Sequence, residues 1–420
     1  MTALPLTGLT VIEFAQYLSG PFAGLKLADL GARVIKIERP VTGDPCRHLY
    51  ISAPVAGENT LFHAINRGKQ SLVADLRNPA DRDMLTRLVA DADVLIQNFR
   101  PGVIERQGFG YDTCKVLNPR LIYGSVSGFG DTDWRDLPGQ DLLAQARSGL
   151  MWLTGSRNDP PVPMGLAVAD MLAGEALAQG ILAALVGRGQ HGQGALIETS
   201  LFEALLSMQF EVLSTHLNDG QQPPDRAETG GAHAYIAAPY GVYQTADGWL
   251  AIAMVPSLAA LAGLLDIDSA TMANLDPLAD RDRIKAVIAA AIPHKTTTEW
   301  LSLLQPADIW CAEVLDWPAL RAHPVWAQLD MQQTLQRDDF SMQTLRGPLR
   351  INGQGLGNGR AAPALGADTE QISRELAVPA MAQVWTGAEP IAAPWRGGTR
   401  EGHLPHKPTT MGGRHDTENC

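Results

Sequence analysis

Residues 10–38 of this chain read TVIEFAQYLSGPFAGLKLADLGARVIKIE, and this stretch sets the expected fold. Residues 10–14 and 34–38 are short runs rich in β-branched and aromatic side chains, which is typical of buried strands. Residues 24–30 between them have helical character and end at Gly31. A strand, a helix and another strand at this spacing predict two parallel strands joined by a crossover helix.

The same alternation continues along the first half of the chain. Strands are expected at 71–75, 94–99, 121–126 and 195–199, and helices at 82–90, 171–186 and 201–213, with a turn at 187–194. We therefore predict the α/β class, with a parallel sheet that is covered by helices and built from residues 1–217. Open sheets of this kind bind ligands at the carboxyl ends of their strands, where we expect the chemistry.

The composition changes near residue 218, where a polar linker begins with DGQQPPD at 219–225. Runs at 239–244 and 249–253 flank the turn ADG at 246–248 and predict a hairpin. We expect a smaller α+β domain over residues 218–330, a polar and loop-rich segment over 331–376, and a weakly structured tail over 377–420.

The overall composition is that of a globular protein, with 45% hydrophobic and 19% charged residues among 420. The formal net charge of −12 argues against nucleic acid and anionic membranes as partners, so a polyanionic substrate would need locally gathered Lys and Arg. Four cysteines lie far apart without a C-x-x-C pair, so neither a metal site nor a disulfide framework is expected. Because no signal peptide or run of about 18 apolar residues is evident, we expect a cytoplasmic protein that does not span a membrane.

Asp170 is the candidate nucleophile because of its sequence neighbours. It ends the motif PMGLAVAD at 163–170 and stands just before the expected helix at 171–186. An Asp at this place can simply cap the helix by accepting from its free N–H groups, and spacing alone favours that interpretation. The alternative is a carboxylate nucleophile, kept ionised by the helix N-terminus and approachable past small side chains.

Basic residues lie close to several of the expected strands. They are Lys36 and Arg39 around the end of the second strand, Lys69 before the third, and Arg100 and Arg106 after the fourth. Cations near adjacent strand ends could hold phosphates, although solvated surface charges are the commoner case. The loop SGFG at 127–130 could present backbone N–H groups to a ligand or be a plain turn.

Several short motifs, taken together and in this order, resemble the family III CoA-transferases, also called the CaiB/BaiF family. They begin with VIEFAQ at 11–16, GP at 20–21, ADLGARVIKIE at 28–38, GD at 43–44 and NRGK at 66–69 with Ser71. They continue with NFRPG at 98–102, GFG at 108–110, NP at 118–119 and AD at 169–170, and end with APY at 238–240, DG at 247–248 and PALG at 363–366. Only the set is specific, because each motif alone is short.

The resemblance implies a large Rossmann-like domain, a smaller α+β domain, a C-terminal segment that returns to the large domain, and two chains interlocked as a homodimer. It implies that Asp170 is the catalytic nucleophile and that Asp141 is an acidic residue near it. The positions that would contact coenzyme A (CoA) are Gln16, Arg39, Lys69, Leu72, Asn98, Phe99 and Arg106. No cofactor would be bound permanently, because CoA and acyl-CoA are substrates. Gly230 and Gly231 match only loosely the glycine loop that covers the active site in formyl-CoA transferases.

These residues and the resemblance predict transfer of CoA from a short acyl-CoA to a small carboxylic acid through an aspartyl-CoA thioester. One alternative is a 2-methylacyl-CoA racemase of the same superfamily, in which a His-Asp pair precedes the aspartate. The matching pair here is Gln140-Asp141, and glutamine cannot carry a proton. A second alternative is a non-catalytic acyl-CoA-binding protein, which the intact motif around Asp170 disfavours.

Overall fold

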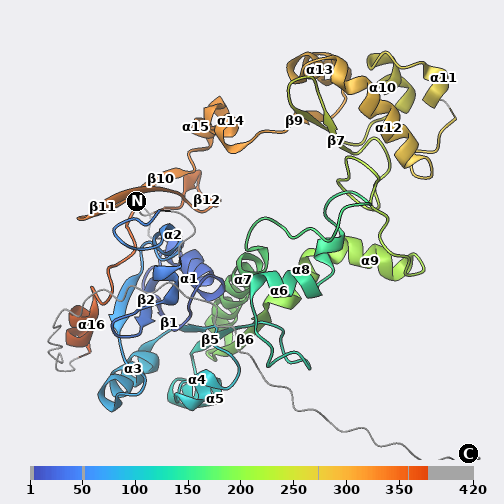
Figure 1. Cartoon of the computed structure of the whole chain (residues 1–420). Coiled ribbons are helices and arrows are strands. Elements are labelled where there is room, and N and C mark those ends of the chain that lie inside the picture. The colour runs from blue at the N-terminus through green and yellow to red at the C-terminus, as the bar shows by residue number, and fades with distance from the viewer. Residues whose placement is uncertain (1–3, 50–52, 273, 358, 377–420) are drawn as a thin grey trace, which may run out of the picture. The chain divides into compact units, whose positions relative to one another are not determined.

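The computed structural model describes residues 4–49, 53–272, 274–357 and 359–376. Its main sheet has six parallel strands in the order β3-β2-β1-β4-β5-β6 (Figure 1). The strands are β1 (Thr10–Glu13), β2 (Arg33–Glu38), β3 (Gln70–Val73), β4 (Val94–Gln97), β5 (Ile122–Ser127) and β6 (Ala195–Ser200). The predicted α/β class with a parallel sheet is confirmed, and the strand order is that of a Rossmann fold.

Both faces of this sheet are buried by helices. Successive side chains of a strand point to opposite faces, so each strand contributes to two core layers. Val11 and Val94 face one layer of helices, whereas their neighbours Ile12 and Leu95 face the other. The first layer contains α1 (Ser19–Asp29), α7 (Val168–His191) and α8 (Leu201–Met208). The second layer contains α3 (Pro79–Asp91), α5 (Tyr111–Leu117) and α16 (Thr369–Glu375).

The strand order changes direction between β1 and β4. From β1 the chain proceeds through β2 to β3 on one side, and from β4 through β5 to β6 on the other. In doubly wound sheets the loops after two such strands diverge, and ligands bind at this point. The loop after β1 leads directly into α1, whose first residue is Ser19.

Helix α7 is longer than the sequence predicts at both ends. It starts three residues before position 171 and continues to residue 191, so most of the expected turn at 187–194 is helical. The helix stops at Gly192, whose φ of 75° lies in the left-handed region that favours glycine. The buried Arg188 fixes this end, because its guanidinium forms an ion pair with Asp93 at 2.8 Å.

Helices α1 and α7 pack against each other very closely (Figure 1). A Cβ atom on Gly174 of α7 would lie 2.5 Å from the carbonyl oxygen of Ser19, so only glycine fits there. By length and composition alone, α7 is the one helix in the described ranges that could cross a membrane. The core helix of a soluble protein meets the same criterion. Glu175 and Gln179 interrupt its apolar residues, which is why a count of consecutive apolar residues does not find it.

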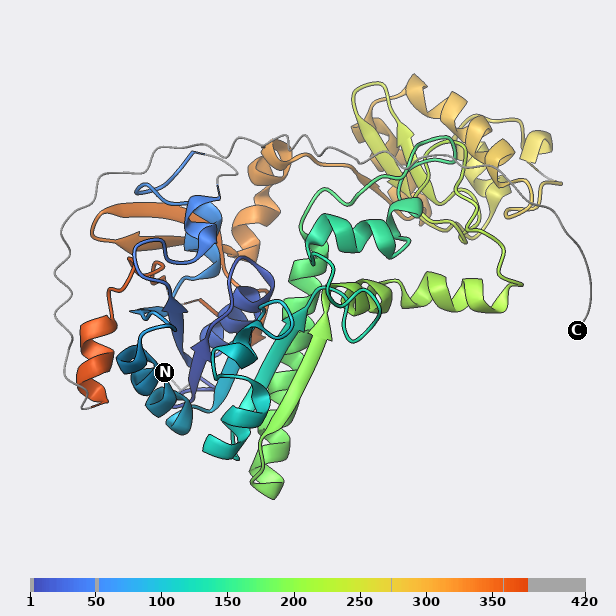
Figure 2. The same ribbon diagram turned by 60° about the horizontal axis from the view of Figure 1, so that its bottom comes forward.

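The single helix expected at 201–213 is two helices, α8 and α9 (Phe210–Asn218), which follow each other along the chain (Figure 2). Gln209 separates them. Its side-chain amide donates to the carbonyl oxygen of Leu205 at 3.0 Å and to that of Ser148 at 3.2 Å. The Gln209 N–H also donates to the Leu205 oxygen, at 3.2 Å, so the backbone ladder continues up to the point where the two helices meet. The prediction of one helix is wrong here.

A second, antiparallel sheet has the order β7-β8-β9. Its strands are β7 (Gly241–Gln244), β8 (Trp249–Ile252) and β9 (Cys311–Glu313), and β7 and β8 form the expected hairpin. Tyr243, Leu250 and Ile252 point from this sheet into a separate core. Its helices are α10 (Leu258–Leu264), α11 (Ser269–Met272), α12 (Arg281–Ala291) and α13 (Thr297–Leu304). The boundaries of a small domain at 218 and 330 stay predictions.

The segment after residue 331 is more regular than the sequence predicts. It forms a hairpin of β10 (Gln332–Arg337) and β11 (Phe340–Leu345). Among these strand residues only Leu335 and Met342 are buried, and the polar side chains around them hide the alternating pattern. The expectation of a loop-rich segment is therefore wrong for this part.

The chain then packs against the edge strand β3. The Asp368 carboxylate accepts from the Ser71 N–H at 2.8 Å, and the Thr369 hydroxyl oxygen accepts from the Val73 N–H at 3.0 Å. The expected tail, 377–420, lies outside the described residues.

Other elements are α2 (Thr60–Ile65), α4 (Val103–Arg106), α6 (Asp141–Arg147), η2 (Leu150–Trp152), α14 (Trp317–Ala322), α15 (Pro324–Leu329), β12 (Arg350–Ile351) and β13 (Gln354–Gly355).

Candidate active site

Asp170 is the third residue of α7 and does not cap that helix. The cap position is Ala167, whose side chain cannot accept a hydrogen bond. Asp141 of α6 replaces it, because its Oδ1 accepts from the Ala169 N–H at 2.7 Å and from the Asp170 N–H at 3.3 Å. Since a carboxylate from another helix satisfies these N–H groups, the Asp170 carboxylate is free for another role.

The half-buried Asp170 carboxylate lies at the N-terminus of α1. Ser19, the first residue of that helix, lies beside it, and its backbone N–H and hydroxyl group act to lower the pKa of Asp170. The N-termini of α1 and α7 therefore meet at one carboxylate. Both helix dipoles favour its ionised form.

Burial and the neighbouring Asp141 carboxylate act in the opposite sense. Together they raise the pKa of Asp170 to about 6, although the hydrogen bonds from Ser19 act to lower it. Asp170 is therefore largely ionised at neutral pH. It is also more basic than an ordinary aspartate, which makes it a better nucleophile.

Asn98 holds Ser19 in place at the change of direction between β1 and β4. Its Oδ1 accepts from the Gln16 N–H at 2.8 Å, and its Nδ2 donates to the Gln16 carbonyl oxygen at 2.8 Å and to the Ser19 Oγ at 3.2 Å. The structure thus brings Gln16, Asn98 and Asp170 together around Ser19. The sequence reasoning missed Ser19, whose signal is a serine at a helix start directly after a strand and its loop.

A buried quartet of charges, Glu13, Lys36, Asp44 and Lys69, lies next to this loop. The Lys36 Nζ is 3.1 Å from Glu13 and 2.8 Å from Asp44, and the Lys69 Nζ is 2.8 Å from Glu13. All four side chains are at most 1% exposed. Two carboxylates and two ammonium groups leave the set neutral, which buried charges require.

The quartet also binds the backbone of the loop after β1 and of the first turn of α1, which contain Gln16 and Ser19. Its contacts are Lys36 with the Ala15 oxygen at 2.8 Å, Asp44 with the Tyr17 N–H at 3.1 Å and Lys69 with the Pro21 oxygen at 2.8 Å. The Lys69 ammonium group donates to protein oxygens only, including that of Asn66 at 3.0 Å. This geometry supports a structural role for Lys69, and its direct contact with CoA stays a prediction.

The other predicted CoA contacts differ in exposure. Leu72 is fully buried and its side chain packs in the core, so a contact with CoA would involve its backbone, and this contact stays a prediction. Phe99 is half-buried, and its N–H donates to the Gln97 side chain at 2.8 Å. Arg39 and Arg106 are exposed, and neither guanidinium group has a hydrogen-bond or ion-pair partner within the described ranges. Their contact with phosphate groups stays a prediction.

Both glycine-containing loops named from the sequence are tied to the protein. In the loop after β5, the Gly130 N–H donates to the Ser127 Oγ at 3.0 Å, and the Gly128 oxygen accepts from a backbone N–H of α8 at 3.1 Å. The Gly230 oxygen accepts from the buried Lys285 Nζ at 2.8 Å. The roles of these loops near a substrate stay predictions.

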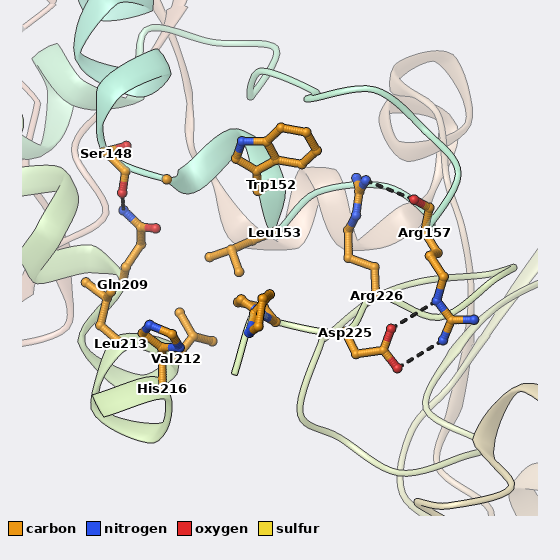
Figure 3. Close-up of a pocket in the computed structure, with 13 residues that line it drawn as sticks. Ser148, Trp152, Leu153, Arg157, Gln209, Val212, Leu213, His216, Asp225 and Arg226 are labelled. Carbon is orange, nitrogen blue, oxygen red and sulfur yellow. Dashed lines mark hydrogen bonds and ion pairs between the residues drawn. The ribbon is translucent and has the colours of Figure 1, made fainter. Parts of the chain in front are cut away.

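A cavity of about 470 Å³ lies beside η2, α9 and the linker that follows (Figure 3). Trp152 and Leu153 line one part of it, and Val212, Leu213 and His216 of α9 line another. The predicted site residues are all described, and none of them lines this cavity. It is therefore separate from the Asp170 site.

The arrangement around Asp170 suits nucleophilic attack on a carbonyl carbon. A basic but ionised carboxylate lies beside an N–H and a hydroxyl donor, and such donors can stabilise an oxyanion. Within the described residues, no group of three or more His, Cys, Asp or Glu side chains could hold a metal ion. The fold and the site define a doubly wound α/β protein with a carboxylate of raised pKa, Asp170, at the start of α7.

Comparison with known proteins assigns the chain to a family within this class. Residues 6–369 match the model of CoA-transferase family III. The acetyl-CoA:oxalate CoA-transferase of Acetobacter aceti is 36% identical over 322 residues, which cover 74% of this chain and 81% of that protein. The succinate–glutarate CoA-transferase of Agrobacterium fabrum is 32% identical over 388 residues, which cover 89% and 96% of the two chains.

A solved structure agrees with these relatives. The crystal structure of a CaiB/BaiF family protein from Brucella suis matches with a TM-score of 0.76 at 31% identity, covering 89% of this chain and 100% of that one. The chain therefore belongs to CoA-transferase family III. It is an enzyme of the CoA-transferase type (EC 2.8.3), and the resemblance stated from the sequence motifs is confirmed.

Proposed function

We propose that this enzyme transfers CoA from a short acyl-CoA donor to a small carboxylic acid through an aspartyl-CoA thioester on Asp170. The observation that carries the proposal is the Asp170 carboxylate, which is not used as a cap and lies between the N-termini of α1 and α7. Its raised pKa makes it a better nucleophile than an ordinary aspartate, and it is still largely ionised at neutral pH.

The exchange takes place in two balanced halves. An Asp170 oxygen attacks the thioester carbonyl carbon, the C–S bond breaks, and CoA leaves as a thiolate, so that a mixed anhydride remains. The thiolate then attacks the Asp170 carboxyl carbon, the anhydride C–O bond breaks, and the donor acid departs as a carboxylate. The acceptor carboxylate reacts with the aspartyl-CoA thioester by the same steps in reverse.

Ser19 is suited to assist these steps. Because Asn98 Nδ2 donates to the Ser19 Oγ at 3.2 Å, the hydroxyl proton of Ser19 is free to point toward Asp170. The hydroxyl and the backbone N–H of Ser19 then form a pair of donors for the negative charge that develops on the aspartyl carbonyl oxygen when the thiolate attacks.

The relatives guide the choice of acids. Names among them contain acetyl-CoA and oxalate, succinate and glutarate, and succinyl-CoA and mesaconate. We therefore propose acetyl-CoA and succinyl-CoA as donors and small dicarboxylates as acceptors. In a chain of net charge −12, exposed cations such as Arg39 and Arg106 would bind the phosphates of CoA.

We propose that two chains interlock as a homodimer, and exposed apolar side chains support this. We propose the cytoplasm as the location of the enzyme. Helices α9, α14 and α15 contain no buried residue, and Phe210 and Trp317 are 71% and 83% exposed. Large exposed apolar surfaces usually mark an interface. Light scattering should give twice the 45.1 kDa of one chain. A mass of one chain at micromolar concentration would contradict the dimer.

The function is tested first with donor alone. Purified enzyme incubated with acetyl-CoA or succinyl-CoA should gain the mass of CoA minus water, located by peptide mapping on the fragment that contains Asp170. Hydroxylamine should release CoA and leave a hydroxamate on that residue, because it attacks thioesters. Addition of oxalate, glutarate or mesaconate should discharge the adduct and yield a new acyl-CoA.

The two alternatives give different results in the same experiment. A racemase would exchange the α-hydrogen of a 2-methylacyl-CoA in heavy water without forming an adduct. A binding protein would bind acyl-CoA and show neither exchange nor adduct. Either outcome contradicts the proposed mechanism.

A further inference from the structure

Gln145 of α6 is almost fully buried, at 1% exposure. Its amide group forms hydrogen bonds with three residues that precede α7 in the chain. Its Oε1 accepts from the Met164 N–H at 2.9 Å. Its Nε2 donates to the Asp141 Oδ2 at 2.7 Å and to the Leu166 carbonyl oxygen at 3.3 Å. Since a backbone N–H can only donate and an ionised carboxylate can only accept, these partners fix which end of the amide points where.

These contacts reach the nucleophile through Asp141. Gln145 binds the Oδ2 of Asp141, while the Oδ1 caps α7 at the N–H groups of Ala169 and Asp170. The same amide also holds residues 164 and 166 of the loop that leads into α7. One side chain, four residues after Asp141 on the same helix, therefore fixes both the cap and the loop.

We propose that Gln145 is a positioning residue, which keeps Asp141 turned toward the start of α7 so that the Asp170 carboxylate remains free to react. The inference rests on the proposed function. Without the Nε2 donor, nothing fixes the second oxygen of Asp141, and the carboxylate can rotate away from α7. The exposed N–H groups then become partners for the Asp170 carboxylate itself, which is no longer available for attack.

The variant Gln145→Met tests this with little change in side-chain length. The rate of loading with acyl-CoA should fall by about tenfold or more, while the KM for acyl-CoA stays within about twofold, because Gln145 is buried and offers no surface to a substrate. Gln145→Leu also removes the donor to Asp141, with a shorter apolar side chain. It should show the same loss, and it serves if the methionine variant does not fold.

Gln209→Met is the matched control. Gln209 is also buried, and its amide donates to the backbone oxygen of Leu205 in α8 and to that of Ser148, directly after α6, without touching Asp141. Loss of a buried amide is thus common to both variants, and loss of the Asp141 contact is not. The Gln209 variant should load at nearly the rate of the unchanged enzyme.

A double-mutant cycle separates positioning from general damage. With Asp141→Ala already present, Gln145→Met should cause no further loss of loading rate, because its effect depends on Asp141. Equal losses in both backgrounds, or a Gln145→Met enzyme that loads normally, would overturn the inference. An unchanged enzyme that never forms the adduct would instead contradict the proposed function.

Discussion

Asp170→Ala is expected to lower the transfer rate by about 1,000-fold or more and to abolish loading of the enzyme with CoA. No nearby carboxylate can replace Asp170, since both oxygens of Asp141 already accept hydrogen bonds. Intact mass spectrometry and an acyl-CoA exchange assay measure the two effects. Burial and Asp141 raise the pKa of Asp170, so its ionised form costs folding free energy at neutral pH. The variant should therefore be at least as stable as the unchanged enzyme.

Glu175→Ala is the control on the same helix. Glu175 is 58% exposed and lies 2.8 Å from the Lys26 Nζ, and such surface pairs contribute about 0–1 kcal/mol. Its activity should stay within about twofold of normal, whereas equal losses would assign the effect to the helix.

Loading should also fall below pH 6, because protonated Asp170 cannot attack. Asp141→Asn should move this decline to lower pH, since it removes the charge that raises the pKa of Asp170.

Lys69→Met should destabilise the fold by about 3–5 kcal/mol, because it leaves Glu13 and Asp44 buried with only one cation, Lys36. Urea unfolding followed by circular dichroism measures this free energy. The fraction of the variant that folds should keep a nearly normal KM for acyl-CoA, since the Lys69 ammonium group donates only to protein oxygens.

Arg39→Gln is the matched comparison, because Arg39 is an exposed cation without a partner in the described part of the chain. It should leave the free energy of unfolding within about 0.5 kcal/mol. It should raise the KM for acyl-CoA about tenfold, through loss of a charge-assisted contact with phosphate. The reverse pattern, with KM raised by Lys69→Met and stability unchanged, would make Lys69 the CoA contact.

The six-stranded sheet could be predicted because it is buried on both faces. Residues 10–14 and 34–38 each contain three apolar side chains among five, and their strands form within one or two residues of the expected bounds. The β10–β11 hairpin could not be predicted in this way, because only one side chain of each strand is buried. A pattern of two buried positions among polar residues does not stand out from a loop.

Only part of the site could be predicted from the sequence, because several of its contacts join residues that lie far apart in the chain. The motif around Asp170 could be found from the sequence, but local spacing favoured a capping role for it. The cap comes instead from Asp141, on a separate helix 29 residues earlier, and only the tertiary structure places it there. Lys69 resembles a surface cation in the sequence because its partner Glu13 lies 56 residues away. Contacts across such distances leave no local pattern.

The neutral quartet limits how this enzyme can be redesigned. Glu13, Lys36, Asp44 and Lys69 hold residues 15–21, which span the loop after β1 and the start of α1, and each charge is buried only because the others are present. A change at one position leaves a buried charge without its partner, while a simultaneous exchange of all four for apolar residues of similar volume removes every charge of the set. Engineering of residues 15–21, which include Ser19, must therefore treat these four positions as one unit of sequence, exchanged together or left alone.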